Sequence, residues 1–296
     1  MQIAVASGKG GTGKTTIATS LALSLSGKGK VTYLDCDVEA PNGHLFLHPD
    51  INQQSQAVVR IPQIVKDRCT LCGKCVEVCQ FHTLVKVGTT IMVFPQLCHG
   101  CGSCTLNCPE QAIMEIPSPI GLLETGVAAK GIHFGRGLLT ISEPMATPVI
   151  RQLKHFENFT REDIVILDAP PGASCSVVET FKKSDFVVLV TEPTPFGLHD
   201  LKQAQGIVSE MKIPAGVIIN RENGNYSALT NFCADTHLPV LMRIPFERRI
   251  AEGLAQGLPL IDIYPEYRYH LQQMYDHIIS IVNEKPDRDS APNVQN

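Results

Sequence analysis

Eight of the eleven cysteines in this chain fall into two groups with identical spacing, C-x2-C-x2-C-x3-C. The first group is Cys69, Cys72, Cys75 and Cys79, and the second is Cys98, Cys101, Cys104 and Cys108. The second group follows the first at an offset of 29 residues, which makes the pair an internal repeat. Clustered thiols in a reducing compartment bind metal more often than they form disulfides. The spacing therefore predicts metal binding.

The spacing also indicates which kind of metal centre these cysteines hold. It matches the bacterial two-cluster ferredoxin run, in which three cysteines of one motif and the last cysteine of the other hold each four-iron cluster. Three thiolates on a tight turn can cap three corners of a cube, and the fourth corner must be reached from elsewhere. On this pattern one 4Fe-4S cluster is held by Cys69, Cys72, Cys75 and Cys108, and the other by Cys98, Cys101, Cys104 and Cys79.

A pair of zinc sites is the alternative interpretation, because C-x2-C knuckles are common zinc ligands. Zinc usually takes its four ligands in two pairs and has no use for two triplets that are each followed by a fourth cysteine. Pro109 follows the second run, as the ferredoxin pattern requires, whereas Gln80 follows the first run in place of proline. This departure concerns the local turn and not the ligands.

The beginning of the chain, "IAVASGKGGTGKTT", predicts a site for nucleotide phosphates. A short apolar strand (3–6) leads into a loop that matches G-x-x-x-x-G-K-[ST], and an apolar helix follows. Glycines let backbone N–H groups converge on phosphates, the lysine neutralises charge, and the Thr15 hydroxyl can bind Mg²⁺. The predicted binding residues are Gly8, Gly10, Gly11, Thr12, Gly13, Lys14, Thr15 and Thr16.

A second lysine in this loop, Lys9, gives the chain a family resemblance. "KGGTGKTT" resembles the deviant Walker A loop of the MinD, ParA, Mrp and nitrogenase iron protein superfamily, whose signature lysine reaches the partner's nucleotide across a dimer. "LDCDVEAPN" (34–42) resembles switch I, which implies that Asp37 positions water or is linked to magnesium, with Asp35 behind it. "IVILDAPPG" (164–172) resembles the Walker B and switch II segment, with Asp168 as its aspartate.

The resemblance extends to the adenine site and covers nearly all of the chain outside the cysteine block. "VIINR" (217–221) resembles the strand end that reads adenine, which implies roles for Asn220 and Arg221. "IPFERRIAEGLAQGLP" (244–259) resembles the segment that closes over the base, with Pro245 and Phe246. Among superfamily members, the chain most resembles MinD-type ATPases that carry an inserted ferredoxin domain. The implied catalytic residues are Lys9, Lys14, Asp37 and Asp168, and the implied magnesium ligands are Thr15 and Asp168.

Strand patterns recur at 3–6, 31–34, 164–167, 186–191, 217–220 and 240–242, with helical patterns between several of them. This order predicts an α/β fold, a doubly wound, mainly parallel sheet of the P-loop NTPase type, with an inserted α+β ferredoxin domain of bacterial type. The expected division is an ATPase domain (1–59 and 119–285), the insertion (60–118) and a polar tail (286–296). Residues 124–136 are rich in glycine, and we expect a loop that moves with nucleotide state or simply connects the modules.

The composition limits the partners that this protein can have. The chain has 296 residues, 18% of them charged, and a formal net charge of -4 with no basic block. This balance gives no reason to expect nucleic acid or an anionic membrane as partner. No apolar run approaches the roughly 20 residues of a spanning helix, no leader pattern opens the chain, and the tail is not amphipathic. A cytoplasmic location is expected.

The remaining cysteines are Cys36, Cys175 and Cys233. Cys36 and Cys233 fit small core positions. Cys175 lies seven residues after Asp168, where the nitrogenase iron protein places a cysteine of its dimer-bridging cluster, but the matching stretch offers His133 and no second thiol. A C-x-x-C near the C-terminus, where Mrp-type carriers hold a transferable cluster, is also missing.

Three functions are compatible with these features. The first is a slow ATPase that couples a nucleotide cycle to electron transfer through two 4Fe-4S clusters. The second is an Mrp-type ATPase that assembles or carries iron-sulfur or metal cofactors, and the third is a redox-sensing positioning or regulatory ATPase. All three use ATP/ADP and Mg²⁺, a homodimer or a heterodimer with a related ATPase, and a redox or metal-cofactor protein as partner.

Overall fold

The six predicted strands form the parallel core of one large sheet. The computed structural model describes residues 1–156, 163–224 and 226–284, so the expected polar tail (286–296) lies outside the described residues. The six strands are β1 (Gln2–Ala6), β2 (Val31–Asp35), β8 (Ile164–Asp168), β9 (Phe186–Thr191), β10 (Ala215–Glu222) and β11 (Val240–Pro245). Their apolar side chains are mostly buried, as expected for strands that are covered on both faces.

The sheet order is β11-β10-β9-β1-β8-β2-β7-β6-β3, and every pair from β11 to β7 is parallel. The chain enters at β1, in the interior of the sheet, and later strands are added on both sides of it. This arrangement confirms the predicted doubly wound, mainly parallel α/β fold. It also brings the carboxyl ends of β1, β2 and β8 to the same edge, where ligands bind in such folds.

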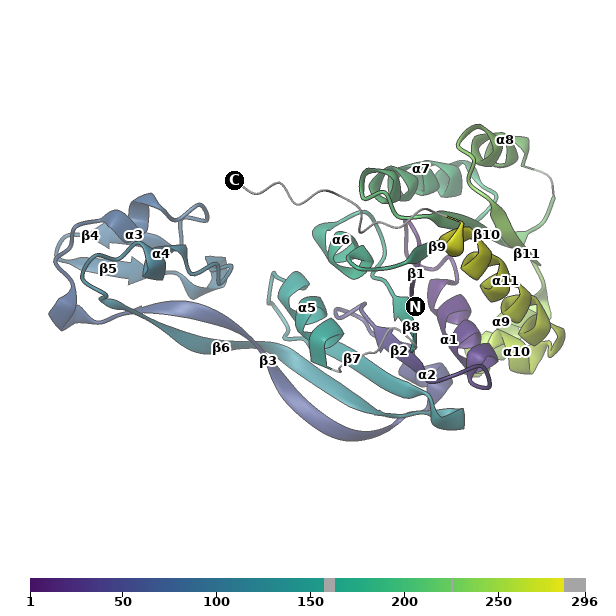
Figure 1. Cartoon of the computed structure of the whole chain (residues 1–296), viewed down its shortest axis with the longest axis horizontal. Helices are drawn as coiled ribbons and strands as arrows, with labels where there is room; N and C mark the ends of the chain where they lie inside the picture. Colours follow the sequence, from purple (N-terminus) through teal and green to yellow (C-terminus); the bar gives the residue numbers. More distant parts are fainter. Residues whose placement is uncertain (157–162, 225, 285–296) are drawn as a thin grey trace.

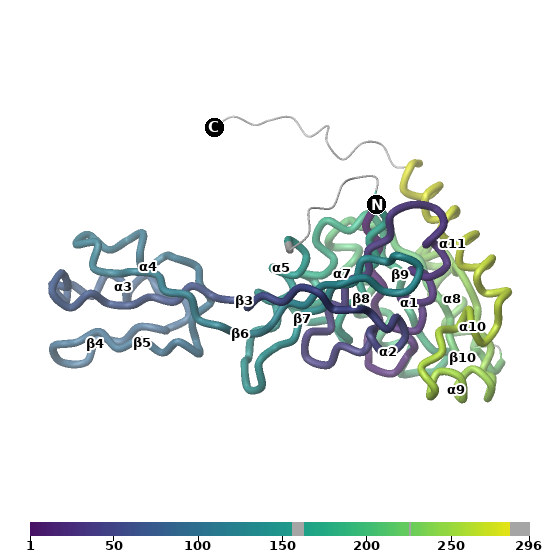
Figure 2. The backbone as a smooth tube through the Cα atoms, turned by 90° about the horizontal axis from the view of Figure 1, so that it is seen from below, coloured from purple at the N-terminus to yellow at the C-terminus, as the bar shows by residue number. Residues whose placement is uncertain are grey.

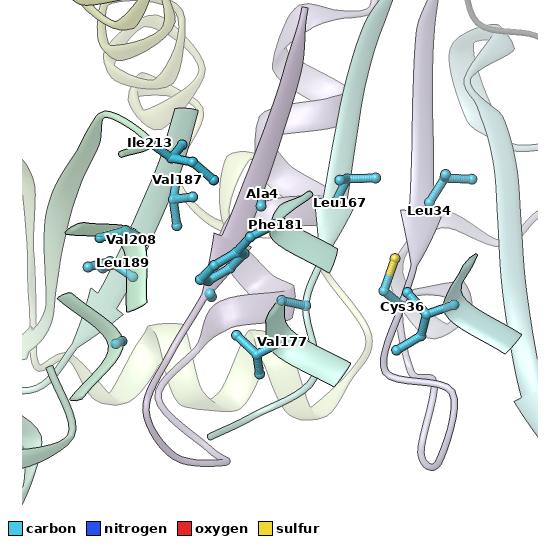
Figure 3. Packing of buried hydrophobic residues seen from close by; sticks show 14 of the residues in the cluster. Ala4, Leu34, Cys36, Leu167, Val177, Phe181, Val187, Leu189, Val208 and Ile213 are labelled. Atoms are coloured by element: carbon cyan, nitrogen blue, oxygen red, sulfur yellow. The ribbon is translucent and has the colours of Figure 1, made fainter. Parts of the chain in front are cut away.

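Helices cover both faces of the sheet (Figures 1 and 2). Alternate residues of β1 point to opposite faces, so Ile3 and Val5 join one core while Ala4 and Ala6 join the other. The first core is closed by α1 (Lys14–Leu25), α10 (Leu260–Ile263) and α11 (Glu266–Asn283), and the second by α5 (Thr147–Phe156), α6 (Cys175–Phe181), α7 (Pro195–Glu210) and α8 (Ser227–Asp235). Figure 3 shows Val177 and Phe181 of α6 in the second core.

Three further strands extend the sheet and were not predicted. β7 (His133–Leu139) is parallel to β2, β6 (Ile113–Val127) is antiparallel to β7, and β3 (Asp50–Ile64) is antiparallel to β6. The expectation of a loop at residues 124–136 is therefore wrong, because most of this stretch belongs to β6 and β7. Two of its glycines serve close packing, since a Cβ at Gly126 would lie 2.0 Å from Asp50 O and one at Gly135 would lie 2.8 Å from Leu34.

β3 and β6 continue beyond the sheet as a two-stranded arm that carries the cysteine-rich segment away from the rest of the molecule (Figure 1). The two strands pair from Asp50 with Val127 to Ile64 with Ile113. The domain boundaries expected at residues 60 and 118 therefore fall inside continuous strands. Gln152 of α5 attaches to the arm, because its side chain accepts a hydrogen bond from Val58 N (3.1 Å) and donates one to Val58 O (3.0 Å).

The segment at the end of the arm repeats its structure with the 29-residue offset of its sequence. The short turns at Lys66–Arg68 and Pro95–Leu97 correspond, as do the helices α3 (Lys74–Glu77) and α4 (Ser103–Leu106). β4 (Leu84–Val87) and β5 (Thr90–Val93) form a separate two-stranded sheet. This repeat places the two cysteine groups in equivalent settings. Of the helices in the described part of the chain, none is long and apolar enough to cross a membrane.

Candidate functional site

The phosphate loop lies between β1 and α1 at the carboxyl edge of the sheet. Gly13 caps α1 with a positive φ of 95° and without a side-chain cap bond, which leaves the first N–H groups of the helix available to an anion. A Cβ at Gly13 would lie 2.3 Å from Asn220 Nδ2, which itself donates to Thr12 O (2.7 Å). Gly8 lies against Asp200, where a Cβ would be 2.3 Å from Asp200 Cβ. Asn220 and Asp200 therefore pack against the loop, while the first N–H groups of α1 stay available to a phosphate.

Lys14 lies among three carboxylates. Its Nζ is 3.3 Å from Asp168 Oδ1 and 3.7 Å from Asp37 Oδ2. Burial opposes the charge of Lys14, but the carboxylates of Asp168, Asp37 and Asp35 outweigh burial and raise its pKa. Tyr33 donates a hydrogen bond to the other oxygen of Asp168 (2.9 Å) and fixes that carboxylate. This role of Tyr33 was not predicted.

Asp35 organises the switch I backbone from beneath. Its carboxylate accepts hydrogen bonds from Gly43 N (2.8 Å) and Asp37 N (3.2 Å), and it is fully buried. Burial, followed by the charge of Asp168, raises the pKa of Asp35 to about 8. Asp35 therefore sets the position of Asp37, which is partly exposed toward the nucleotide side of the loop.

This raised pKa predicts a pH-dependent stability. Because the folded-state pKa lies above the ordinary value of about 3.9, the folded protein binds this proton more tightly than the unfolded chain does. The free energy of unfolding of the nucleotide-free protein should fall as pH rises from about 4 to about 8, and Asp35→Asn should remove that decline. Urea denaturation of both proteins at several pH values measures it. A wild-type curve that is flat in this window, or equal slopes for both proteins, would contradict the assignment.

A cavity of about 350 Å³ opens above the phosphate loop. Its lining includes Gly10, Gly11, Gly13, Lys14, Thr15, Thr16, Asp37, Asn220, Arg221, Pro245 and Phe246. These residues come from four segments that lie far apart in the sequence. Asn42, Ile250 and Leu254 also line the cavity; they lie in the predicted segments 34–42 and 244–259 but were not predicted individually, and Phe46 lies outside both segments. Phe46 and Phe246 offer the aromatic and apolar surface that a base requires, while the loop offers the phosphate end.

Lys9 is not part of this lining and pairs with Glu192 instead. Its Nζ is 3.2 Å from Glu192 Oε2, and Arg221 Nη1 is 2.7 Å from Glu192 Oε1. Glu192 follows β9 and was not predicted. Because the Lys9 side chain is 38% exposed and Glu192 keeps its ion pair with Arg221, Lys9 can leave Glu192 without leaving this largely buried carboxylate unpaired.

The eight spaced cysteines line two small cavities at the end of the arm. Cys69, Cys72, Cys75 and Cys108 line the first cavity, and Cys79, Cys98, Cys101 and Cys104 line the second. Each cavity thus combines three thiols of one motif with the last thiol of the other. Equivalent backbone groups contact the two crossing sulfurs, Thr83 N to Cys79 Sγ at 3.3 Å and Ala112 N to Cys108 Sγ at 3.2 Å.

The thiols of each set are placed where they could bind metal. All eleven cysteines are free, and burial raises the pKa of the Cys75, Cys98 and Cys104 thiols, so these three would become thiolates only with a bound metal cation. In the described residues, no three His, Cys, Asp or Glu side chains converge closely enough for a single ion. The four sulfurs of each set line one cavity, so these four thiols are the residues that could together hold a metal centre.

The other cysteines occupy the places expected of them or lie at the surface. Cys36 and Cys233 are buried in the core on the α5–α8 side of the sheet, and burial raises the pKa of the Cys36 thiol to about 12. Cys175 is exposed at the first position of α6, and His133 begins β7. Neither belongs to the two cysteine-lined cavities.

The chain resembles known proteins over nearly its full length. It is 28% identical over 280 residues to the uncharacterized protein MJ0579 of Methanocaldococcus jannaschii, covering 94% of this chain and 98% of that protein. It is 26% identical over 280 residues to an iron-sulfur cluster carrier protein of Aquifex aeolicus, covering 89% of this chain and 62% of that protein.

Among solved structures, the septum site-determining protein MinD of Pyrococcus horikoshii in complex with Mg-ADP aligns with a TM-score of 0.56 and 17% identity, over 96% of this chain and 99% of that one. At this identity the likeness shows the fold alone. Residues 3–260 match the model of the CobQ/CobB/MinD/ParA nucleotide binding domain. With its phosphate loop, lysine and carboxylates gathered at one edge of the sheet, the chain is an ATPase that belongs to the CobQ/CobB/MinD/ParA nucleotide-binding domain family.

Proposed function

We propose that this ATPase couples its nucleotide cycle to electron transfer through two 4Fe-4S clusters in the cysteine-lined cavities. The observation that carries the proposal is the crossed composition of each cavity, three thiols from one motif and one from the other, at the end of an arm that begins in the ATPase sheet. The clusters, when bound, supply one-electron carriers at the end of the arm. The residues of the chain hold them and connect them to the nucleotide site.

In the nucleotide site each residue has a distinct task. The phosphate loop and Lys14 neutralise phosphate charge, and Thr15 and Asp168 are the residues that would hold Mg²⁺. Asp37, held by the carboxylate of Asp35, positions the attacking water. No strong general base lies in this arrangement of described residues, which supports slow turnover.

The first connection between nucleotide and arm runs through switch I (34–42). Val38 O accepts a hydrogen bond from Leu139 N (2.8 Å) at the end of β7. The helix α2 (His44–Leu47), which follows switch I, contributes Phe46 to the nucleotide cavity. Burial and then the charge of Arg136 in β7 lower the pKa of His44, the first residue of α2, so the helix that lines the nucleotide cavity also lies near this guanidinium.

The root of the arm is itself tied together across three strands. Arg136 Nε of β7 lies 2.6 Å from Glu124 Oε2 of β6, and Gln54 Nε2 of β3 donates to Glu124 Oε1 (2.7 Å). Glu124 is almost fully buried, so a movement of α2 against this group changes the surroundings of a desolvated ion pair.

A second connection runs through switch II. Pro171 lines the nucleotide cavity, and the chain continues into α6. Lys154 of α5 donates to the carbonyls of Glu179 (3.1 Å) and Thr180 (2.7 Å) near the end of α6, while Gln152 of the same helix holds Val58 of the arm. A displacement of switch II can thus reach β3 through α6 and α5, which the hydrogen bonds of Lys154 join.

The carrier function remains a second candidate, because the relatives include proteins named iron-sulfur cluster carriers. Cys72 and Cys101 are exposed, one in each set, which a carrier could use to release its cargo. Transfer of iron and sulfide from the loaded protein to an apo-ferredoxin distinguishes the two functions. Retention of clusters through many ATP turnovers favours electron transfer, and release with turnover favours the carrier.

The proposal is tested first by the content of the anaerobically purified protein. We expect about eight iron and eight acid-labile sulfide per chain, with electron paramagnetic resonance signals of reduced 4Fe-4S clusters. ATP hydrolysis should require Mg²⁺. A protein that instead holds about two zinc ions and no sulfide would overturn the electron-transfer proposal.

The position of Lys9 predicts that its replacement impairs ATP hydrolysis much more than ATP binding. If Lys9 leaves Glu192 to contact the nucleotide of a second subunit, Lys9→Ala should reduce hydrolysis about a hundredfold or more and leave the Kd for ATP within a few-fold of wild type. Phosphate release and equilibrium binding of a fluorescent ATP analogue measure the two effects. Equal losses of binding and hydrolysis would place Lys9 in an ordinary phosphate-binding role within its own subunit.

A further inference from the structure

The repeat at the end of the arm allows each residue near one cysteine set to be compared with its equivalent near the other. Lys86 in β4 and Glu115 in β6 are equivalent by the 29-residue offset, and they carry opposite charges. Lys74 and Ser103, the first residues of α3 and α4, are also equivalent. The backbone repeats while these charges do not, so the two cavities have different electrostatic surroundings.

Positive charge is gathered at the first cavity. Lys86 Nζ donates a hydrogen bond to Leu71 O (2.6 Å), and Leu71 lines the cavity between Cys69 and Cys72. Lys74 lines the same cavity, and its ion pair with Glu77 is long (3.7 Å) and exposed, so it removes little of the lysine charge. Glu110 is the acidic residue of this lining.

Negative charge lies closer to the second cavity. Glu115 lines it and is half-buried, with Oε1 only 3.1 Å from the position of a Cβ on Gly102. Arg60 of the arm also lines this cavity, but it is exposed, as are Lys74 and Lys86 at the first cavity, so solvent screens these three charges more strongly than that of Glu115. Ser103, at the position of Lys74, adds no charge.

We propose that these charges order the two reduction potentials, so that the cluster of Cys69, Cys72, Cys75 and Cys108 is the one reduced first. The inference rests on the proposed function, because it requires both clusters. Reduction adds negative charge to a cluster, so a nearby lysine favours it and a nearby carboxylate opposes it. Lys86 and Glu115 are the residues that set the difference.

The two cavities lie at different distances from the ATPase part along the arm. β3 leaves the ATPase sheet and passes Arg60 and Pro62, which line the second cavity, before it reaches Ile64, which lines the first. The second set is therefore nearer the ATPase part, and a single electron rests at the set farther from it. A partner that takes this electron has to approach the end of the arm.

Redox titration of the loaded protein, followed by electron paramagnetic resonance, tests the order. Lys86→Gln should lower the higher of the two potentials, and Glu115→Gln should raise the lower one. The swap Lys86→Glu with Glu115→Lys should change the ratio of the two reduction equilibrium constants at least tenfold, which corresponds to about 59 mV for one electron. Iron and sulfide contents confirm that the variants remain loaded.

Exposed charges on the ATPase part provide the controls. Lys130→Gln and Glu210→Gln remove the same charges far from both cavities and should leave the two potentials unchanged. If Lys86→Gln lowers the lower potential, or if neither substitution changes the gap in a protein with about eight irons, the inference fails while the two-cluster proposal stands. A wild-type protein with less iron and a single one-electron step would overturn both.

Discussion

Replacing Lys14 with glutamine should reduce ATP hydrolysis by at least about a hundredfold and weaken nucleotide binding as well. The Lys14 side chain is 8% exposed and lies between Asp168, which is fully buried, and Asp37. Without the ammonium group these carboxylates would face the triphosphate with no compensating charge, so the site would repel its substrate. This differs from Lys9→Ala, for which binding should persist.

Phosphate release and equilibrium nucleotide binding measure this effect, and Lys28→Gln is a matched control. Lys28 lies just after α1 and pairs with Asp276 at the surface, away from the loop. The control should hydrolyse ATP at the wild-type rate. Hydrolysis by Lys14→Gln within tenfold of wild type would show that the phosphates lie elsewhere.

The second large effect is expected from single cysteine substitutions. Cys108→Ala should remove about four of the eight irons, because Cys108 lines the first cavity although it belongs to the second motif. Cys79→Ala should remove the other four. In each variant one of the two potentials should disappear from the titration while the other remains.

Pairs of substitutions reveal the crossing directly. Cys108→Ala combined with Cys72→Ala affects one cavity and should lose no more iron than Cys108→Ala alone. Cys108→Ala combined with Cys101→Ala affects both cavities and should lose nearly all of it. The opposite result would mean that each motif binds its own metal without crossing.

The parallel core and the phosphate loop could be predicted because their signals are local. Buried parallel strands appear as short apolar runs, and a glycine-rich loop between a strand and a helix has a fixed spacing. The two cysteine sets could be anticipated for the same reason, since the repeat lies within 40 residues of sequence, from Cys69 to Cys108.

The arm could not be predicted, because its strands lack the usual marks. Pro117 and Pro119 lie inside β6 and pair with β3, and the boundary expected at residue 118 falls between them. β7 pairs with β6 only from Gly121 to Val127, so the part of β6 that contains both prolines has no strand on that side. A missing N–H that faces this side costs no hydrogen bond of the sheet. The glycines of β7 suggested a loop, although their role is to admit side chains from neighbouring elements.

Contacts that depend on the order of strands in the sheet could not be predicted from the sequence either. Tyr33 reaches Asp168 because β2 and β8 are neighbours, although 135 residues separate them in sequence. Glu192 holds Lys9 and Arg221 because β9 and β10 end beside the loop. The sequence contains these residues, but only the assembled sheet shows which of them meet.

The most direct test of the coupling between nucleotide and clusters is the potential of each cluster measured without nucleotide, with ADP and with a non-hydrolysable ATP analogue. If the oxidised and reduced forms bind ATP with affinities that differ tenfold, linkage requires a shift of about 59 mV in the potential. The contacts of switch I, α2 and α5 with the arm predict such a shift, which should be lost in Lys14→Gln. Potentials that are identical in all three states of the wild-type protein would contradict the account.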